Sequence, residues 1–382
     1  MIKYSALGMH LQLNQVVMAG SHDAGITKGA GNVRTQSLNI HDQAAAGVRI
    51  FDLRVGAQGK GDHGSGQEAT MKAYHAALNV KTKATRVISD LATKNKGVTQ
   101  MTILPGMGDF GMGLTKMLQD ARKFVERNRD EFLILKFDKC SNWTAIAQAC
   151  VRYLDTAIYA SRGNLNTKTL REVAGKVIVV FTPDGLVEVG TAKGYGPALG
   201  INGISRVSTD HPYDPLYEGI QYCGKGGTKV SNFFGDKIKE NIATQSTYLK
   251  EGAAGNPDVM GMMYWTTTGL FESIKQRNKS MWKDKKVNAL RTLWEGGLAE
   301  SIQSRLSSNI NPKDYSSGGL LKTFMPNFVM IDFADEDKCR TIFGLNTLAS
   351  TQLTEAAKLV DQHVKLVGAA SPARTGRPAV RR

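Results

Sequence analysis

The residues with the clearest chemical potential follow a short apolar run near the N-terminus, in the segment Gly20-Ser-His-Asp-Ala-Gly25. The run 16–19 predicts a buried strand, and the two glycines let the backbone turn tightly around His22 and Asp23. Side chains at the carboxyl end of a buried strand are where an α/β barrel presents its reactive groups. An imidazole beside a carboxylate suits proton transfer. Taken alone, the segment fits a polar turn equally well.

A second apolar run, 47–56, carries two charges on one face. Strand alternation puts Phe51, Leu53 and Val55 on one side and Asp52 and Arg54 on the other. If the face with Asp52 and Arg54 points into a barrel, each charge needs an opposite charge beside it or a role in binding or catalysis, because an uncompensated buried charge costs several kcal/mol. The run therefore predicts a charged position inside the fold.

A third segment, 71–78, contains Tyr74-His75 in a short apolar setting. Together, Ser21-His-Asp-Ala-Gly25, the run Gly47-Val-Arg-x-Phe-Asp-Leu-Arg-Val55 and Tyr74-His75 resemble the catalytic X region of phosphatidylinositol-specific phospholipase C. The similarity is greatest to the bacterial, metal-independent branch. The segments 131–138 and 327–333 resemble two further strands of that family. The resemblance is strong over about residues 14–140, patchy over 141–320, and recovers at 327–333.

The resemblance implies a function for each of these side chains in cleaving a phosphodiester. His22 would be the general base on the inositol 2-hydroxyl, and His75 the general acid toward the diacylglycerol oxygen. Asp332 would orient His22, and Asp23 would support His75.

The same resemblance implies that Arg54 holds the phosphate, since a guanidinium offers two parallel donors. Asp52 would help to position Arg54 and the inositol hydroxyl, and Lys136 is a candidate for binding the headgroup. The products would be diacylglycerol and a cyclic inositol phosphate, which water can open later. No cofactor and no metal are expected.

Two departures from the family leave alternatives open. The family's second histidine is normally followed by glycine, whereas His75 is followed by Ala76, so the triplet Asp62-His63-Gly64 competes for the role of acid. A metal-dependent glycerophosphodiesterase or phospholipase D-like enzyme of the same superfamily is the alternative reaction, although Arg54 stands where a second metal-binding acid is expected. A non-catalytic barrel that binds membranes is the third possibility.

Strands alternate with helices along the chain, which favours a parallel sheet and a TIM-type (β/α) barrel, distorted or carrying insertions. The expected strands are 16–23, 48–56, 71–77, 131–138, 176–184, 259–268 and 327–333. The expected helices are 85–91, 114–127, 143–157, 282–306 and 351–367. The segments 57–70 and 185–255 are expected to be loop-rich.

The composition suits one domain over residues 1–367, followed by a basic, disordered tail at 368–382. The chain has 382 residues, 10 prolines without a proline-rich linker, and 41% hydrophobic residues. The four cysteines are widely spaced, which predicts free thiols rather than a disulfide framework or a metal site. We expect a monomer.

The net charge of +15 calls for an anionic partner. We expect peripheral contact with a phospholipid membrane and no nucleic-acid partner, because no zinc, helix-turn-helix or RNA-binding motif is present. No apolar run is long enough for a transmembrane segment, and the first residues lack the features of a signal peptide. These features predict a protein that is cytoplasmic or exported by a route that needs no signal peptide.

Overall fold

A computed structural model describes most of the chain. The described residues are 1–59, 68–76, 81–85, 87–88, 98–103, 108–208, 210–225, 240, 244–245, 258–266, 273–283, 326–347 and 365.

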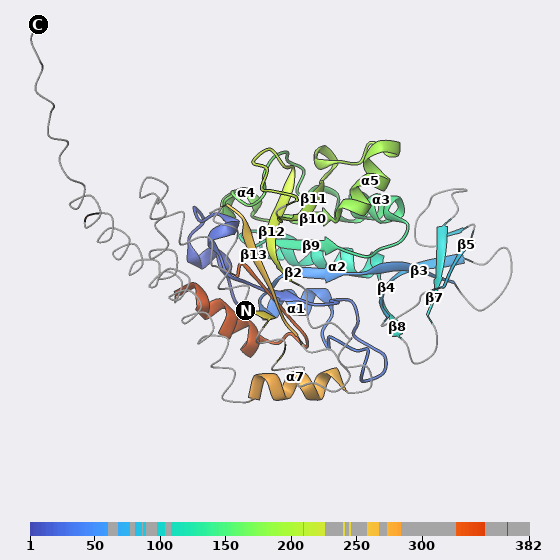
Figure 1. Ribbon diagram of the computed structural model, residues 1–382, viewed down its shortest axis with the longest axis horizontal. Coiled ribbons are helices and arrows are strands. Elements are labelled where there is room, and N and C mark those ends of the chain that lie inside the picture. Colours follow the sequence, from blue (N-terminus) through green and yellow to red (C-terminus); the bar gives the residue numbers. More distant parts are fainter. Residues whose placement is uncertain are drawn as a thin grey trace, which may run out of the picture.

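Eight parallel strands form a closed barrel in the order β1-β14-β13-β12-β11-β10-β9-β2 (Figure 1). Their bounds are β1 Met18–Ser21, β2 Val48–Leu53, β9 Leu133–Phe137, β10 Val177–Phe181, β11 Ile201–Arg206, β12 Gly219–Lys225, β13 Met260–Trp265 and β14 Phe328–Ile331. The expected TIM-type barrel is thereby confirmed.

Strand β1 closes the barrel because it pairs with β14 on one side and with β2 on the other. This contact is tight at Gly20, where an added Cβ would lie 2.2 Å from the Met330 sulfur and 2.8 Å from the Ile50 Cγ2. The closure brings together the carboxyl ends of three strands that carry predicted site residues: β1, β2 and β14.

Helices cover the outside of the barrel (Figure 1). Their bounds are α1 Ile40–Ala46, α2 Leu114–Arg127, α3 Trp143–Leu154, α4 Leu170–Val173, α5 Pro183–Lys193 and α7 Ile274–Lys283, with 3-10 turns η1 Tyr4–Leu7, η2 Leu13–Gln15, η3 Asp155–Ala157 and η4 Pro197–Leu199. The apolar stripe predicted for α2 is buried along its whole length, from Leu114 to Val125.

A second sheet of six strands lies to one side of the barrel (Figure 1). Its strands are β3 Val55–Gly59, β4 Glu68–Ala76, β5 Lys81–Thr85, β6 Val87–Ile88, β7 Val98–Thr102 and β8 Gly108–Gly113. The order is β5-β7-β3-β4-β6, and β8 pairs with β4. Because β3 begins two residues after β2 ends, the sheet is joined directly to the barrel wall next to Arg54.

This sheet corrects three expectations. The predicted third strand, 71–77, exists as part of β4 but pairs antiparallel with β3 and β8 outside the barrel. The helix predicted at 85–91 is wrong where the structure describes it, because Thr85 ends one strand, Lys81–Thr85, and Val87–Ile88 is another, and their β-branched residues suit extended backbone. Residues 86 and 89–91 lie outside the described part. The loop predicted at 57–70 is partly strand at both ends, and residues 60–67 lie outside the described part.

The segment predicted to be loop-rich, 185–255, contains two barrel strands, β11 and β12, and most of α5. The sequence pattern does not predict these two strands, because glycines and polar residues interrupt their apolar residues. Those glycines are needed where the strands pair, since a Cβ on Gly219 would lie 2.0 Å from the Gly203 carbonyl oxygen. The local composition thus reflects close backbone approach rather than a loop.

The expectations for 284–306 and for the tail at 368–382 lie outside the described residues, as does nearly all of the helix predicted at 351–367. Within the described part, no helix combines the length and apolar character that crossing a bilayer requires. The four cysteines are free, as expected.

Candidate active site

The first half of the site is a histidine–carboxylate pair formed where β1 and β14 lie side by side. His22 Nδ1 is 2.9 Å from Asp332 Oδ1, and both side chains are buried. The His22 backbone N–H also donates to the Ile331 carbonyl, which keeps the two strand ends in register. The contact implies that Nδ1 carries a proton, so that Nε2 is the nitrogen available for proton transfer.

A buried amide fixes the backbone beneath this pair. The Gln36 amide nitrogen donates to the carbonyl oxygens of His22 and Ile331, at 2.9 and 3.1 Å. Its amide oxygen accepts from the Ala334 backbone N–H at 3.0 Å. Gln36 therefore ties the end of β1 to the end of β14 and fixes the spacing between the imidazole and its carboxylate.

The second half of the site is organised by Asp23. Its Oδ2 lies 2.6 Å from His75 Nδ1 and 3.5 Å from His22 Nε2, while its Oδ1 lies 3.0 Å from Arg54 Nε. Asp23 has the left-handed φ of 43°, a conformation that aspartate tolerates better than most residues. One carboxylate thus faces two histidines and a guanidinium.

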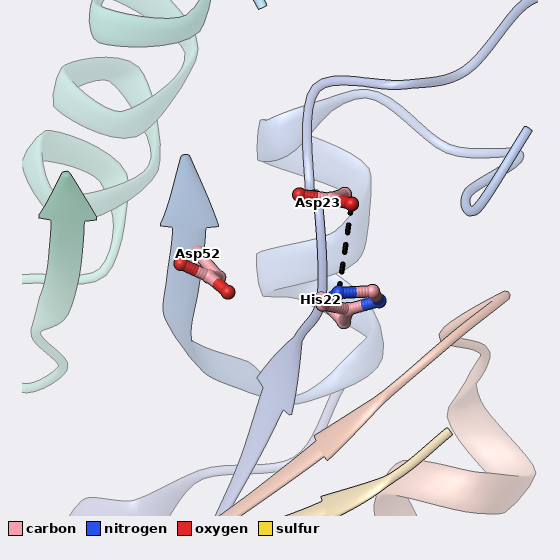
Figure 2. A group of neighbouring side chains, drawn as sticks. All are labelled: His22, Asp23 and Asp52. Carbon is pink, nitrogen blue, oxygen red and sulfur yellow. Dashed lines mark ion pairs between the residues drawn. The ribbon is translucent and has the colours of Figure 1, made fainter. Parts of the chain in front are cut away.

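Asp52 lies on the neighbouring strand, β2, across from His22 and Asp23 (Figure 2). Its partners differ from those of Asp23. Its Oδ1 accepts a hydrogen bond from Lys136 Nζ at 2.9 Å, and its Oδ2 accepts one from the Tyr264 hydroxyl at 3.2 Å. Lys136 also contacts Asp138 Oδ2 at 3.2 Å. Lys136 and Asp52 are therefore a buried ion pair rather than two separate groups facing solvent.

Neighbouring charges shift the pKa values of the site. Burial opposes protonation of His22, but the carboxylates of Asp23 and Asp332 outweigh burial and raise the His22 pKa to about 9. Burial also disfavours the charged form of Asp23, yet Arg54 and His22 hold the pKa of Asp23 well below its usual range. In turn, Asp23 raises the pKa of Arg54. At neutral pH the Asp23 carboxylate is ionised and His22 is mostly protonated.

Ligand atoms of His22, Asp23 and Asp52 lie within 4.8 Å of one another, close enough to consider a metal ion (Figure 2). The surrounding charges do not suit one. Asp52 already faces the Lys136 ammonium and Asp23 faces the Arg54 guanidinium. A divalent cation prefers several oxygen ligands and is repelled by both groups.

The structure brings together all the residues singled out from the sequence, namely His22, Asp23, Asp52, Arg54, His75, Lys136 and Asp332. One expected contact differs: Asp52 pairs with Lys136, whereas Arg54 pairs with Asp23. Lys136, expected to bind the headgroup, is itself only 2% exposed. The competing His63 lies outside the described residues.

Sequence reasoning missed three residues of this network. Asp138 follows Lys136 at the two-residue spacing of a strand, a pattern that could have identified it. Tyr264 lies in an apolar, methionine-rich strand, where an aromatic side chain gives no sign of a polar contact. Gln36 acts on backbone carbonyls that only the folded chain brings together.

No protein-family model and no curated protein matches this chain. Among solved structures, it is similar to the phosphatidylinositol-specific phospholipase C from Listeria monocytogenes, with 14% identity, a TM-score of 0.47, and coverage of 89% of this chain and 96% of that one. A structure of the phosphatidylinositol-specific phospholipase C from S. aureus has 16% identity and a TM-score of 0.45, and the match covers 89% of this chain and 95% of that one. A calcium-dependent phosphoinositol-specific phospholipase C from Pseudomonas sp. has 13% sequence identity and a TM-score of 0.34, and the match covers 58% of this chain and 78% of that one.

Proposed function

We propose that this protein cleaves the phosphodiester of phosphatidylinositol-type phospholipids by metal-independent acid–base catalysis. The observation that carries the proposal is the pair of histidines on two different carboxylates, His22 on Asp332 and His75 on Asp23, with the Arg54 guanidinium beside them. In-line displacement at phosphorus needs a base, an acid and positive charge near the phosphoryl oxygens. This arrangement supplies one residue for each task.

In the proposed reaction, neutral His22 takes the proton of the inositol 2-hydroxyl through Nε2. That oxygen forms a bond to phosphorus while the bond from phosphorus to the diacylglycerol oxygen breaks. Protonated His75 gives its proton to the leaving oxygen. The products are diacylglycerol and a cyclic inositol phosphate, and Arg54 neutralises charge on the phosphoryl oxygens throughout.

The inositol headgroup is proposed from the motif resemblance, together with the polar groups beside the histidines. Next to the buried Asp52–Lys136 pair, the partly exposed carboxylate of Asp138 is an acceptor that suits a headgroup rich in hydroxyls. A surface with net positive charge suits an anionic lipid layer, to which each nearby Lys or Arg contributes about 1 kcal/mol. We therefore propose peripheral binding to anionic membranes as the setting for catalysis.

Release of water-soluble label from headgroup-labelled phosphatidylinositol vesicles in EDTA tests the proposal. We expect release by the wild type and a rate at least about a hundredfold lower in His22→Ala, because loss of a general base costs about 10²–10⁴-fold. Phosphatidylcholine vesicles are the headgroup control. Release only after calcium or magnesium is restored would favour the metal-dependent phosphodiesterase, and vesicle binding without release would favour a non-catalytic barrel.

A further inference from the structure

Tyr264 reaches the candidate site from the far side of the barrel interior. It lies on β13, which is separated from β2 by both β1 and β14. Its side chain nevertheless contacts Asp52 on β2 and Lys136 on β9, with oxygen-to-oxygen and nitrogen-to-oxygen distances of 3.2 and 3.3 Å. The residue is 8% exposed, so these contacts are made away from bulk solvent.

The hydroxyl completes the coordination of a buried ion pair. Asp52 has one oxygen on Lys136 and the other on Tyr264, while the Lys136 ammonium donates to Asp52, Asp138 and Tyr264. A buried ion pair is stable only when its remaining lone pairs and protons are also satisfied. Burial raises the pKa of the Tyr264 hydroxyl, so it stays protonated and remains a donor across the physiological range.

Asp52 has a second cation within electrostatic reach, because its charge helps to raise the pKa of Arg54. If Asp52 turned toward Arg54, it would compete with Asp23 and with a substrate phosphate for the guanidinium. The Tyr264 hydroxyl opposes that rotation by holding Oδ2. Its ring also meets the His22 imidazole edge-on, with centroids 5.7 Å apart at 81°.

We propose that Tyr264 is a positioning residue for the phosphodiester cleavage proposed above. Its hydroxyl keeps Asp52 on Lys136 and so leaves Arg54 free to face Asp23 and the substrate phosphate, while its ring edge supports His22. The inference rests on the proposed function for its kinetic consequence. The contacts themselves are independent of that function.

The test compares Tyr264→Phe with Tyr217→Phe, which removes a hydroxyl of the same kind from a residue packed near Gly203. We expect Y264F to lower kcat about tenfold and to change KM less than kcat, because it removes the hydroxyl that donates to Asp52 and accepts from Lys136. We expect Y217F to match the wild type. Equal kcat in Y264F and wild type would overturn the proposal.

A double-mutant cycle with Asp52→Asn checks the route of the effect. If Tyr264 acts through Asp52, the double variant D52N/Y264F should have a kcat within about twofold of D52N alone. Full additivity of the two losses would contradict the route.

Crystal structures of wild type and Y264F provide a readout that needs no turnover and no Asp52 variant. We expect the Asp52 carboxylate of Y264F to rotate from Lys136 toward Arg54. An unmoved carboxylate would overturn the proposal, whereas a wild type inactive toward phosphatidylinositol would refute only the proposed function.

Discussion

At the scale of single residues, the site depends on Asp23, whose carboxylate is shared by His22, His75 and Arg54. Sharing places two imidazoles and one guanidinium around a single buried negative charge. It also keeps the Arg54 guanidinium fixed beside the position proposed for the phosphate. Asp23, the residue that follows the proposed base in sequence, therefore contacts every group that the proposed chemistry needs.

The raised pKa of His22 predicts an unusual pH profile. A general base must be neutral, so kcat/KM should rise with pH until His22 has lost its proton, with an apparent pKa of about 9. Replacing Asp332 by Asn removes one of the carboxylates that raise this pKa, so D332N should move the acid limb to lower pH. Measuring kcat/KM between pH 5 and 10 for both proteins checks this, and an identical acid limb in the two would contradict it.

Under the proposed function, Arg54 is expected to do what a metal ion does in metal-dependent phosphodiesterases. Arg54→Ala should lose at least about a hundredfold in kcat, the typical cost of removing a donor that stabilises transition-state charge. Arg54→Lys should recover less than about tenfold of that loss, because an ammonium lacks the planar fork. Arg152→Lys, on the exposed face of α3, is the matched control.

EDTA should leave the rates of wild type and both Arg54 variants unchanged. Full activity of R54K would show that a point charge suffices and that the geometry of the guanidinium is not used.

At the scale of elements, the proposed acid comes from the second sheet rather than from the barrel. His75 lies on β4. The residue before it, Tyr74, donates its backbone N–H to the Arg54 carbonyl oxygen. Strand β8 packs so closely on β4 that a Cβ at Gly108 would lie 2.1 Å from the His75 carbonyl oxygen. The position of His75 relative to Asp23 is therefore set by strand pairing on both sides of β4.

These contacts favour His75 over His63 as the acid. His75→Ala should lower kcat about a hundredfold or more, and His63→Ala should stay within about twofold of wild type, since general acids contribute 10²–10⁴-fold. Headgroup release from phosphatidylinositol measures both variants. Comparable unfolding temperatures for the two proteins are the control, and the reverse order of activities would assign the role to His63.

The sequence predicted the barrel because most of its strands are apolar and β-branched, as in Val177–Phe181. It predicted α2 because the apolar residues recur at helical spacing. It missed β11 and β12, whose glycines serve strand pairing, and it assigned β4 to the barrel because a single strand does not reveal its partners. Pairing is a long-range property that no local window contains.

For the site, the motif resemblance selected the histidines and carboxylates that the fold brings together, whereas residue types and spacing alone left His22-Asp23 open to interpretation as a polar turn. The pairing of Asp52 with Lys136, and of Arg54 with Asp23, was not predictable from the sequence. It depends on which strand lies next to β2. Lys136 on β9 lies directly opposite Asp52 in register, and this register appears only once the barrel is closed.

At the scale of the whole molecule, net charge should govern where the protein acts. With a net charge of +15, binding to vesicles containing phosphatidylinositol should weaken as salt rises from 0.1 to 0.5 M, because exposed charges are screened beyond roughly 10 Å at 0.1 M. Sedimentation with phosphatidylinositol vesicles, and with neutral phosphatidylcholine vesicles as control, measures this. Equal binding at both salt concentrations, or to both lipids, would refute the electrostatic account.

The most direct test of the central claim is the chemical identity of the first product. Phosphorus NMR of phosphatidylinositol incubated with the wild-type protein in EDTA separates a cyclic phosphodiester from a linear phosphomonoester. Attack by the neighbouring inositol hydroxyl predicts that the cyclic phosphate accumulates first and that no metal is needed. A linear phosphate appearing from the start, or no product until a divalent cation is added, would contradict the account.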